Sequence, residues 1–274
     1  MRRIQHSTHF TTMGIDAELA SENTTPERRE RLKGYKSNME LAEKVYQMAV
    51  DAGAEPFNCG AMRAAFYKAQ WETVKADRAI EIAKEAMASG DDKAQAAIFF
   101  SRKKFDHQDL HALADMARKA HGKNKEAGDA AHAAIKAELE GLFHDDPIER
   151  IVKEFGEENV AQVHGGFKGD HRAEVAAYQG GQKRVAVCTI AKAGTGLSLH
   201  DKVGDAPRHQ INCGMPYTAS EFTQYSFRSH RLGSKSDTNQ HYLLGDHDSE
   251  RRNAGIIRQK MESMGSLTLG DPGH

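Results

Sequence analysis

The sequence predicts an α/β protein: a mostly parallel sheet with helices on both faces, preceded by a helical N-terminal region. Short apolar runs alternate with amphipathic segments between residues 91 and 264. This alternation is typical of parallel sheets whose strands are joined by helices. The preceding residues carry mainly helical periodicity. We therefore expect a helical region at 1–90, an α/β domain at 91–264 and a tail at 265–274.

Composition limits the classes of function. Hydrophobic residues make up 39% of the chain, charged residues 28%, and the net charge is -1. A neutral balance gives no overall attraction to nucleic acid, so such binding would need a local patch. The three cysteines lie far apart, which predicts reduced thiols in a cytoplasmic protein. The sequence shows neither a signal peptide nor an apolar stretch long enough to cross a membrane, so we expect no membrane partner.

The N-terminal region is predicted to be mostly helical. Residues 1–25 show no clear period and are expected to lack regular structure. Residues 26–52 predict a helix, and the Gly- and Pro-containing segment 51–60 predicts a break. A second long helix is predicted at 61–89, with Gly90 as its C-terminal cap.

The α/β domain is predicted to begin with a buried strand at 96–100. A helix capped by Asp106 and an Ala-rich helical stretch at 120–144 follow. Asp146 and Pro147 then predict the cap and first turn of another helix, which Gly156 ends. The remaining elements are predicted as strand 160–163, helix 172–178, strand 184–190, strand 209–213, helix 219–230, strand 241–244 and helix 249–264.

A glycine-containing loop follows the predicted strand 184–190. Ligands of parallel α/β sheets bind at the carboxyl ends of strands, where this loop begins. Gly194 and Gly196 permit a close approach of the backbone to a phosphate. Taken alone the signal is weak, because glycine-rich turns between a strand and a helix are common. Hydroxyl groups that could join the contact belong to Thr189, Thr195 and Ser198.

A second polar element lies on the predicted helix after Pro216. Thr218 has capping-box spacing to the glutamate three residues later. Gln224, Arg228 and Arg231 are spaced i, i+4 and i+7, so we expect them on one helical face. Two neighbouring arginines repel unless an anion lies between them, and a phosphoryl group suits their geometry. The alternative is a solvated arginine face.

Together the two elements resemble motifs V and VI of superfamily 2 helicases. The run Gln224–Arg231 resembles the Gln-x-x-Gly-Arg-x-x-Arg pattern of motif VI, and the run Gly194–His200 resembles motif V. Their order and separation are similar to those of the Swi/Snf-type and strawberry-notch-like branches. The strand 96–100 is similar to the motif IV strand, and the segment 163–166 resembles the one after it. The resemblance covers about residues 90–264 and implies the second RecA-like lobe of a helicase.

The resemblance implies roles for individual residues. Arg228 and Arg231 would be arginine fingers at an ATP site between two lobes, and Gln224 would couple that site to the other lobe. Phe227 stands where the family usually has glycine, so a bulky ring would alter the approach of Arg228 to the nucleotide. The nucleotide contacts would be Gly194, Thr195 and Gly196. The contacts to the nucleic-acid backbone would be Thr189, Lys192, Ser198, His164 and Gly165.

The sequence lacks the parts that would bind ATP on its own. No Gly-x-x-x-x-Gly-Lys-Ser/Thr loop is present, and Gly122-Lys123-Asn124 is only a fragment of one. No Asp-Glu pair ends an apolar strand. ATP and Mg²⁺ would therefore be bound mainly by a separate first lobe carrying Walker A and B motifs. His107 and His111 have zinc-ligand spacing but no acidic third ligand in the usual pattern, so we expect no metal site.

Three functions stay open at this stage. The first is a helicase or DNA translocase lobe that completes an ATPase with a partner lobe. The second is a non-hydrolytic nucleic-acid-binding or regulatory module that retains the fold, which Phe227 and the missing Walker motifs would favour. The third is a structural protein that binds a partner through its helical first half. The sequence does not distinguish DNA from RNA, or unwinding from translocation.

Overall fold

A computed structural model of the chain shows two compact units, each built from separate stretches of sequence. The unit that we call the helical unit comprises residues 14–74 and 105–146. The sheet unit comprises residues 1–13, 75–104 and 147–274. The residues that the structure describes are 6–88, 93–102, 107–193, 198–216, 218–226, 228–230 and 233–268.

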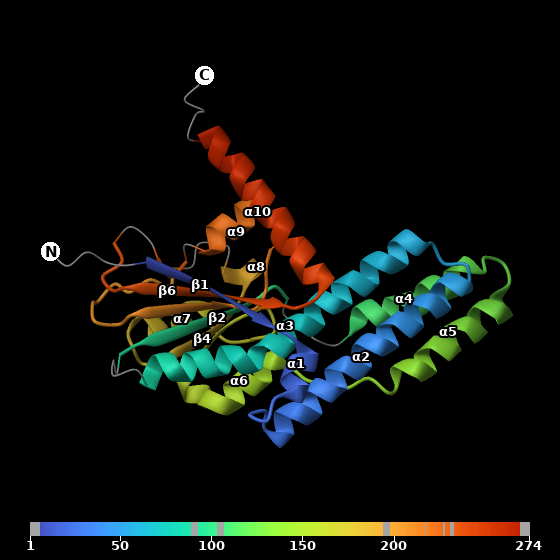
Figure 1. Ribbon diagram of the computed structural model, residues 1–274, viewed down its shortest axis with the longest axis horizontal. Helices are drawn as coiled ribbons and strands as arrows, with labels where there is room; N and C mark the ends of the chain where they lie inside the picture. Colours follow the sequence, from blue (N-terminus) through green and yellow to red (C-terminus); the bar gives the residue numbers. More distant parts are fainter. Residues whose placement is uncertain are drawn as a thin grey trace. The chain divides into compact units, whose positions relative to one another are not determined.

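The sheet unit is built around a six-stranded sheet with the order β1-β6-β5-β2-β4-β3 (Figure 1). Each pairing between neighbouring strands is parallel, which confirms the predicted α/β class. The strands are β1 (His6–Met13), β2 (Gln95–Phe100), β3 (Val160–Val163), β4 (Val185–Thr189), β5 (Arg208–Asn212) and β6 (Thr238–Gly245).

The central strands are buried on both faces. Every residue of β2 and β4 is buried, and Ile98 of β2 pairs with Val187 of β4. Phe99 and Cys188 belong to an apolar cluster with Tyr178 and other side chains that cover one face. Because side chains alternate along a strand, their neighbours in sequence face the opposite side. Burial on both faces explains why these strands are continuous apolar runs.

Helices cover both faces of the sheet. They are α6 (Pro147–Phe155), α7 (His171–Gln179), the short α8 (Ile190–Ala193), α9 (Ala219–Ser226), α10 (Asp248–Thr268) and the C-terminal part of α3 (Pro56–Ala88). Right-handed crossovers require α6 and the C-terminal part of α3 on one face, and α7 and α9 on the other. In Figure 1, α9 lies on one side of the sheet, and α6 and α3 lie on the other.

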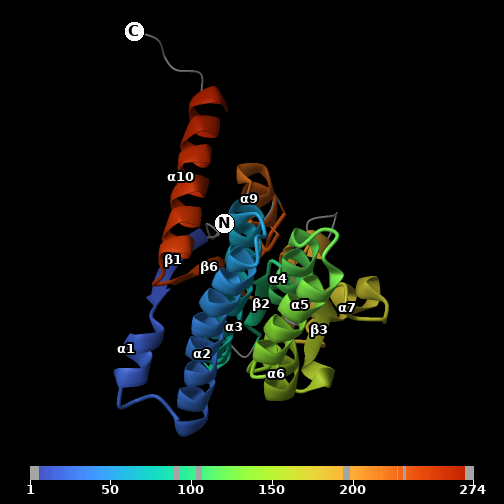
Figure 2. The same cartoon turned by 90° about the vertical axis from the view of Figure 1, so that its right-hand side faces the viewer.

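The helical unit packs α4 and α5 as an antiparallel pair against α2 (Figure 2). Its apolar core includes Val45 of α2, Phe66 of α3, Leu113 of α4 and Ile135 of α5. Thr25 caps α2 by accepting a hydrogen bond from the backbone N–H of Arg28 at 3.3 Å. Its helices are α1 (Ile15–Ala20), α2 (Pro26–Asp51), the N-terminal part of α3, α4 (Gln108–Ala120) and α5 (Lys125–Leu139).

The prediction that residues 1–25 lack regular structure was wrong, because they contain β1 and α1. Strand β1 is mostly polar, and its partner β6 lies more than two hundred residues later, so local periodicity could not reveal it. The predicted break at 51–60 is also shorter, since α3 begins at Pro56. Proline is favoured in the first helical turn, where its missing N–H costs nothing. Gly90 and Asp106 lie outside the described residues.

All three cysteines are buried as free thiols. Burial raises the pKa of Cys188 above its ordinary value, so this side chain behaves as a core residue. Within the described ranges, the helices do not combine the length and apolar character that crossing a bilayer would require.

The core of the helical unit depends on a buried amide, and this gives a first test. The side-chain N–H₂ of Asn38 donates to Gln70 at 2.9 Å and to the carbonyl of Phe143 at 2.8 Å, and its oxygen accepts the Phe143 N–H. Asn38→Ala removes these three bonds and leaves the buried Gln70 without this donor, although the Phe143 carbonyl still has His107 Nε2 at 3.2 Å. The variant should lower the free energy of unfolding by about 2 kcal/mol. Urea denaturation measures this. The exposed control Asn23→Ala should change it by less than about 0.5 kcal/mol, and equal effects would contradict the assignment.

Candidate functional site

Two of the predicted loops leave the sheet side by side. Val163 of β3 pairs with Cys188 of β4, so the next residues, His164 and Thr189, are neighbours at the carboxyl edge. Both are buried. Lys192, on the short helix α8 after β4, is exposed. This edge therefore brings together predicted nucleic-acid contacts from both loops.

The loop after β3 folds back on itself. The His164 carbonyl accepts the Phe167 N–H at 3.2 Å, and His171 Nε2 lies 2.9 Å from the same oxygen. The His164 ring lies against Gln162, with Nε2 at 3.1 Å from Oε1. Gly165 is exposed at the start of the turn. The backbone of Gly165 is thus accessible, whereas the His164 side chain is held in the interior.

The loop that resembles motif V is described only in part. Gly194, Thr195 and Gly196 lie outside the described residues. Beyond them, the Ser198 hydroxyl contacts the ring of His200, and the Ser198 carbonyl accepts a bond from Gln179 at 2.6 Å.

One hydrogen bond joins the two segments that resemble helicase motifs. The Leu199 N–H donates to the Arg228 carbonyl at 2.9 Å. Leu199 is fully buried, and its own carbonyl accepts a bond from Arg208 Nε at 3.0 Å. The end of the motif V-like loop is therefore fixed both to the motif VI-like segment and to the start of β5.

The helix that resembles motif VI is shorter than predicted. The Thr218 hydroxyl accepts the Glu221 N–H at 3.2 Å, which confirms the predicted N-terminal cap. The helix ends at Ser226, so the prediction of one helical face shared by Gln224 and Arg228 was wrong. Gln224 is exposed on α9, whereas Arg228 follows the helix and is 4% exposed. Phe227 and Arg231 lie outside the described residues.

Side-chain amides from the sheet explain where α9 stops. Gln210 of β5 donates to the Tyr225 carbonyl at 3.1 Å, and Gln240 of β6 donates to the Ser226 carbonyl. The Arg228 N–H bonds to Tyr225, three residues back, instead of four. Once the last carbonyls are bonded in this way, the α-helical pattern is not needed to satisfy them.

These amides belong to a buried polar network that holds the segment after α9. The Ser229 N–H donates to Gln210 Oε1 at 3.3 Å, and Thr238 donates to the Ser229 carbonyl at 3.2 Å. The Tyr242 hydroxyl donates to Gln240 Oε1 at 2.9 Å and lies 2.9 Å from Ser226 Oγ. Burial raises the pKa of Tyr242 to about 12, so its hydroxyl stays protonated and keeps this donor.

A buried carboxylate organises the loop between β4 and β5. Asp201 accepts the backbone N–H groups of Val203 and Gly204, each at 3.0 Å, and the Ser236 hydroxyl at 2.5 Å. Arg208 Nη2 lies 3.7 Å from it, and both side chains are fully buried. Burial alone would raise the pKa of Asp201, but the bonds from Ser236, Val203 and Gly204, together with Arg208, outweigh it and lower the pKa.

A second buried ion pair fixes the connection from β5 to α9. Lys75 of α3 pairs with Glu250 of α10 and donates to the Cys213 carbonyl at 3.1 Å. Glu250 also accepts the Gly245 N–H at the end of β6, at 3.3 Å. The pair thus holds together the carboxyl end of β5, which precedes the motif VI-like segment, and that of β6, which follows it.

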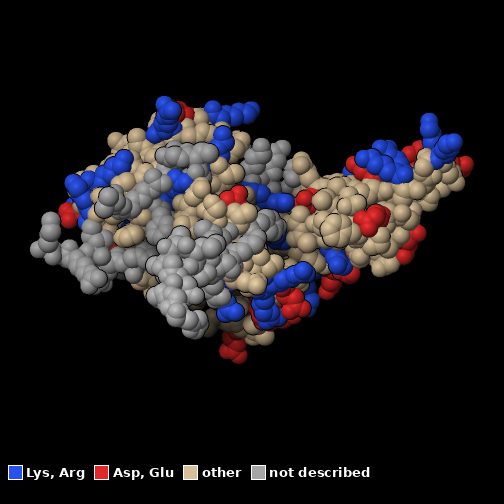
Figure 3. All heavy atoms as spheres, turned by 90° about the horizontal axis from the view of Figure 1, so that it is seen from above, with Lys and Arg blue, Asp and Glu red and all other residues tan. Residues whose placement is uncertain are grey.

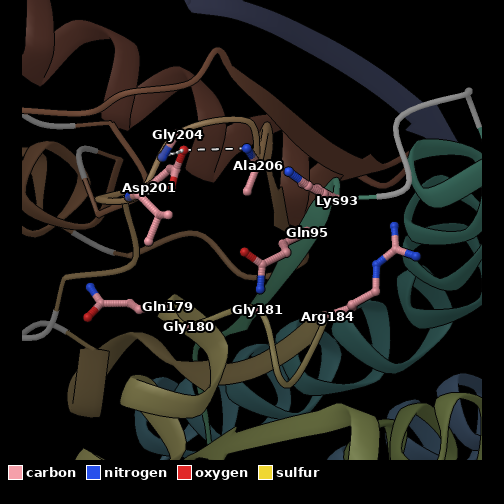
Figure 4. Close-up of a pocket in the computed structure, with 10 residues that line it drawn as sticks. Lys93, Gln95, Gln179, Gly180, Gly181, Arg184, Asp201, Gly204 and Ala206 are labelled. Atoms are coloured by element: carbon pink, nitrogen blue, oxygen red, sulfur yellow. Dashed lines mark hydrogen bonds between the residues drawn. The ribbon is translucent and has the colours of Figure 1, made fainter.

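A cavity of about 310 Å³ lies at the opposite edge of the sheet (Figure 4). It is lined by residues at the amino ends of β2 and β4, among them Gln95 and Arg184, and by Asp201 and Gly204. His164, Thr189 and Lys192 follow the carboxyl ends of β3 and β4 and do not line this cavity.

Charge is mixed on the face of the described surface that Figure 3 shows. Figure 3 shows Lys and Arg interspersed with Asp and Glu, consistent with the net charge of -1. His107, one of the two histidines with zinc-ligand spacing, is the N-cap of α4 with φ 58°, whereas His111 lies within that helix. Among the described residues, no group of three or more His, Cys, Asp or Glu side chains could hold a metal ion.

Sequence reasoning missed the residues that position the motif segments. Arg208, Gln210 and Gln240 are polar residues inside buried strands, and Lys75 is a buried cation in a helix. Of these residues, only Gln210 lies within a predicted strand, 209–213, where a polar side chain was an available signal because buried polar groups need specific partners. Arg208 and Gln240 precede the predicted strands 209–213 and 241–244.

The Asp201 interaction gives the second test. Asp201→Asn leaves the Arg208 charge buried without its counter-charge, so we expect a loss of about 3 kcal/mol in the free energy of unfolding. The matched control is Asp205→Asn, because the Asp205 side chain is 81% exposed. Urea denaturation of both variants measures the difference. A loss no larger than that of the control would contradict the role of Asp201.

Comparison with known proteins supports the motif resemblance. No protein-family profile matches the chain. An ATP-dependent RNA helicase of Acanthamoeba polyphaga mimivirus is 32% identical over 104 residues, which is 37% of this chain and 19% of that protein. The strawberry notch homolog of Caenorhabditis elegans is 31% identical over 94 residues, 33% of this chain and 5% of that protein. Strawberry notch of Drosophila melanogaster is 31% identical over 97 residues, 34% of this chain and 6% of that protein.

Among solved structures, the C-terminal part of the Fun30 ATPase domain aligns with a TM-score of 0.47 and 10% identity, covering 93% of this chain and 89% of that one. Because this TM-score is below 0.5, the α/β fold is assigned from the parallel sheet itself. The chain spans less than a fifth of the mimivirus helicase and a smaller share of the strawberry notch proteins. Over about a third of its length the chain is nevertheless related in sequence to these proteins, and its resemblance to a helicase C-terminal lobe is confirmed.

Proposed function

We propose that the chain is the second ATPase lobe of an ATP-dependent superfamily 2 helicase or DNA translocase. The observation that carries the proposal is the 2.9 Å hydrogen bond from Leu199 to Arg228, which ties the motif V-like and motif VI-like segments together. Two short sequence patterns that resemble one ATPase thus meet in the fold. One protein related to the chain in sequence is named as a helicase.

The lobe would need a first lobe with Walker A and B motifs. That lobe would be another polypeptide or another part of a longer chain. Mg²⁺ would be held there and by the ATP phosphates, since the described residues offer no cluster of metal ligands. From this lobe, Gly194, Thr195 and Gly196 would contact the nucleotide.

The arginines would supply positive charge to the ATP site. A transferring phosphoryl group gains negative charge on its oxygens, and guanidinium groups stabilise it. The backbone of Arg228 is fixed through Leu199 and Tyr225, which defines where its side chain begins. Arg231 would be the second finger, and Gln224, exposed on α9, would contact the partner lobe.

Nucleic acid would bind at the carboxyl edge of β3 and β4. Contacts to phosphates position a strand without reading its sequence, as stepping along DNA or RNA requires. Exposed Lys192 would contribute charge, and the exposed backbone of Gly165 a neutral contact. Half-buried Ser198 would complete the contact surface. Thr189 and His164, which were also predicted as contacts, are buried and would support this edge from beneath.

A non-hydrolytic nucleic-acid-binding or regulatory module is the second candidate. The observation that favours it is the burial of Arg228, which is 4% exposed. An arginine finger has to extend into a cleft, so Arg228 would have to turn outward when the partner lobe docks. In a regulatory module the side chain would keep its buried position.

Mixing with a Walker-containing lobe separates the candidates. The chain should raise the ATPase rate of that lobe, and Arg228→Ala or Arg231→Ala should lower the stimulated rate by at least about a hundredfold. The exposed control Arg252→Ala should keep it. Retained binding to the partner lobe, measured by calorimetry, shows that the variants fold. Full stimulation by both arginine variants would reject the finger role and favour the regulatory module.

Salt dependence tests the nucleic-acid surface. If Lys192 contacts one phosphate, Lys192→Ala should reduce the slope of log K against log salt by about one. Fluorescence anisotropy with labelled single- and double-stranded DNA measures the slope. The control is Lys202→Ala, an exposed lysine beside Asp201. An unchanged slope for Lys192→Ala would remove this residue from the interface.

A further inference from the structure

Three histidine rings lie against one another across three adjacent strands. His241 of β6 is the central ring. The ring of His9 from β1 stacks on it at 5.0 Å between centroids, with 20° between planes. The ring of His209 from β5 stacks at 5.6 Å and 15°, with its Nδ1 3.3 Å from His241 Nε2. We call this group the histidine ladder.

The ladder joins the edge strand to the interior of the sheet. Strand β1 ends the sheet order and pairs with β6. On the face opposite His9, Phe10 stacks on Tyr242 at 5.3 Å but is 67% exposed. Ser7 bonds to Asn239. Among the described side chains of β1, Ser7, His9 and Phe10 each contact β6, and the Ser7 hydroxyl also lies 3.2 Å from His9 Nε2. The His9–His241 stack is thus one of the side-chain contacts that join β1 to β6.

Groups that are or can become cationic face the central ring from three elements. His9 faces it from β1, His209 from β5 and Arg78 from α3. Arg78 is bonded to Glu81 at 3.0 Å and to Glu85 at 2.9 Å, which partly balances its charge. Burial, followed by His209, His9 and Arg78, lowers the pKa of His241 from 6.5 to about 4. At neutral pH the central ring is neutral.

We propose that the histidine ladder is an acid-sensitive latch that holds β1 on the sheet, and that protonation releases β1 from β6. A neutral ladder stacks and shares a ring-nitrogen contact. When two stacked rings are both protonated, for example those of His9 and His241, two like charges lie about 5 Å apart and repel each other. Once β1 leaves, His241 loses the ring that covers it and accepts a proton more readily.

The direction of the pH effect follows from linkage. A histidine whose pKa is lowered in the folded state stabilises that state while it is neutral. This contribution is fully present above pH 6.5 and is lost as the pH falls toward about 4, because the released state binds more protons. Release of β1 should therefore occur in that window.

Release would also uncover the side chain that contacts α9. Tyr242 would lose Phe10, and its hydroxyl lies 2.9 Å from Ser226 at the end of that helix. The consequence for the motif VI-like segment rests on the proposed function, whereas the latch itself does not.

Amide hydrogen exchange on the intact chain tests the latch. Exchange rates are corrected for their intrinsic pH dependence and followed from pH 7.5 to 4.5. The amides of β1 should lose protection below pH 6.5 while those of β2 and β4 keep theirs. The proposal is overturned if β1 stays protected to pH 4.5, or if all strands lose protection together.

Two variants separate titration from packing. His9→Phe and His241→Phe retain an aromatic ring that cannot be protonated. His9→Phe should shift the release of β1 to lower pH by about one unit, whereas His241→Phe removes the linked group and should keep β1 protected down to pH 4.5. His9 is exposed, so its variant carries little risk of misfolding. The control His132→Gln lies in the helical unit beside Asp115 and should leave the midpoint unchanged. A midpoint for His9→Phe equal to that of the unmodified chain would reject the latch.

Discussion

The buried pair of Asp201 and Arg208 is the constraint on which the sheet unit depends. Both side chains are fully buried, and a charge in that position is tolerated only with a counter-charge and hydrogen bonds. Arg208 begins β5 and bonds to Gln95 at the start of β2 and to the Leu199 carbonyl. Asp201 accepts a hydrogen bond from the hydroxyl of Ser236, which lies shortly before the start of β6. The pair therefore sets where three strands begin and where the motif V-like loop ends, and through Leu199 it fixes the backbone of Arg228.

The sequence predicted those helices and strands whose formation depends on residues within the element itself. Strand β2 could be predicted because it is continuously apolar, and α6 because Pro147 lies in its first turn and its apolar residues share a face. Strand β1 could not, since its stability comes from β6 and from stacking on His241 and Tyr242. The end of α9 was missed for a similar reason: it depends on amides of Gln210 and Gln240 that come from other strands.

The candidate site divides in the same way. The residue types of Arg228, Thr189 and Lys192 and their resemblance to helicase motifs could be read along the chain, but the burial of Arg228 and Thr189 could not. The sequence placed Arg228 on an open helical face, whereas it follows the helix and is 4% exposed. The residues that cause this difference, such as Gln210, bind the backbone of the segment and belong to none of the helicase-like motifs. Positioning residues of this kind are visible only as polar side chains in buried strands.

The burial of Arg228 decides what an assembled ATPase would require. Its guanidinium would have to leave a packed interior, and that step costs free energy unless an anion receives it. In the proposed complex the phosphates of ATP on the first lobe would be that anion. Docking and nucleotide binding would then be coupled, because each would favour the outward position of the same side chain. The fixed backbone of Arg228 limits this change to the side chain, so the Leu199 hydrogen bond would serve as the pivot.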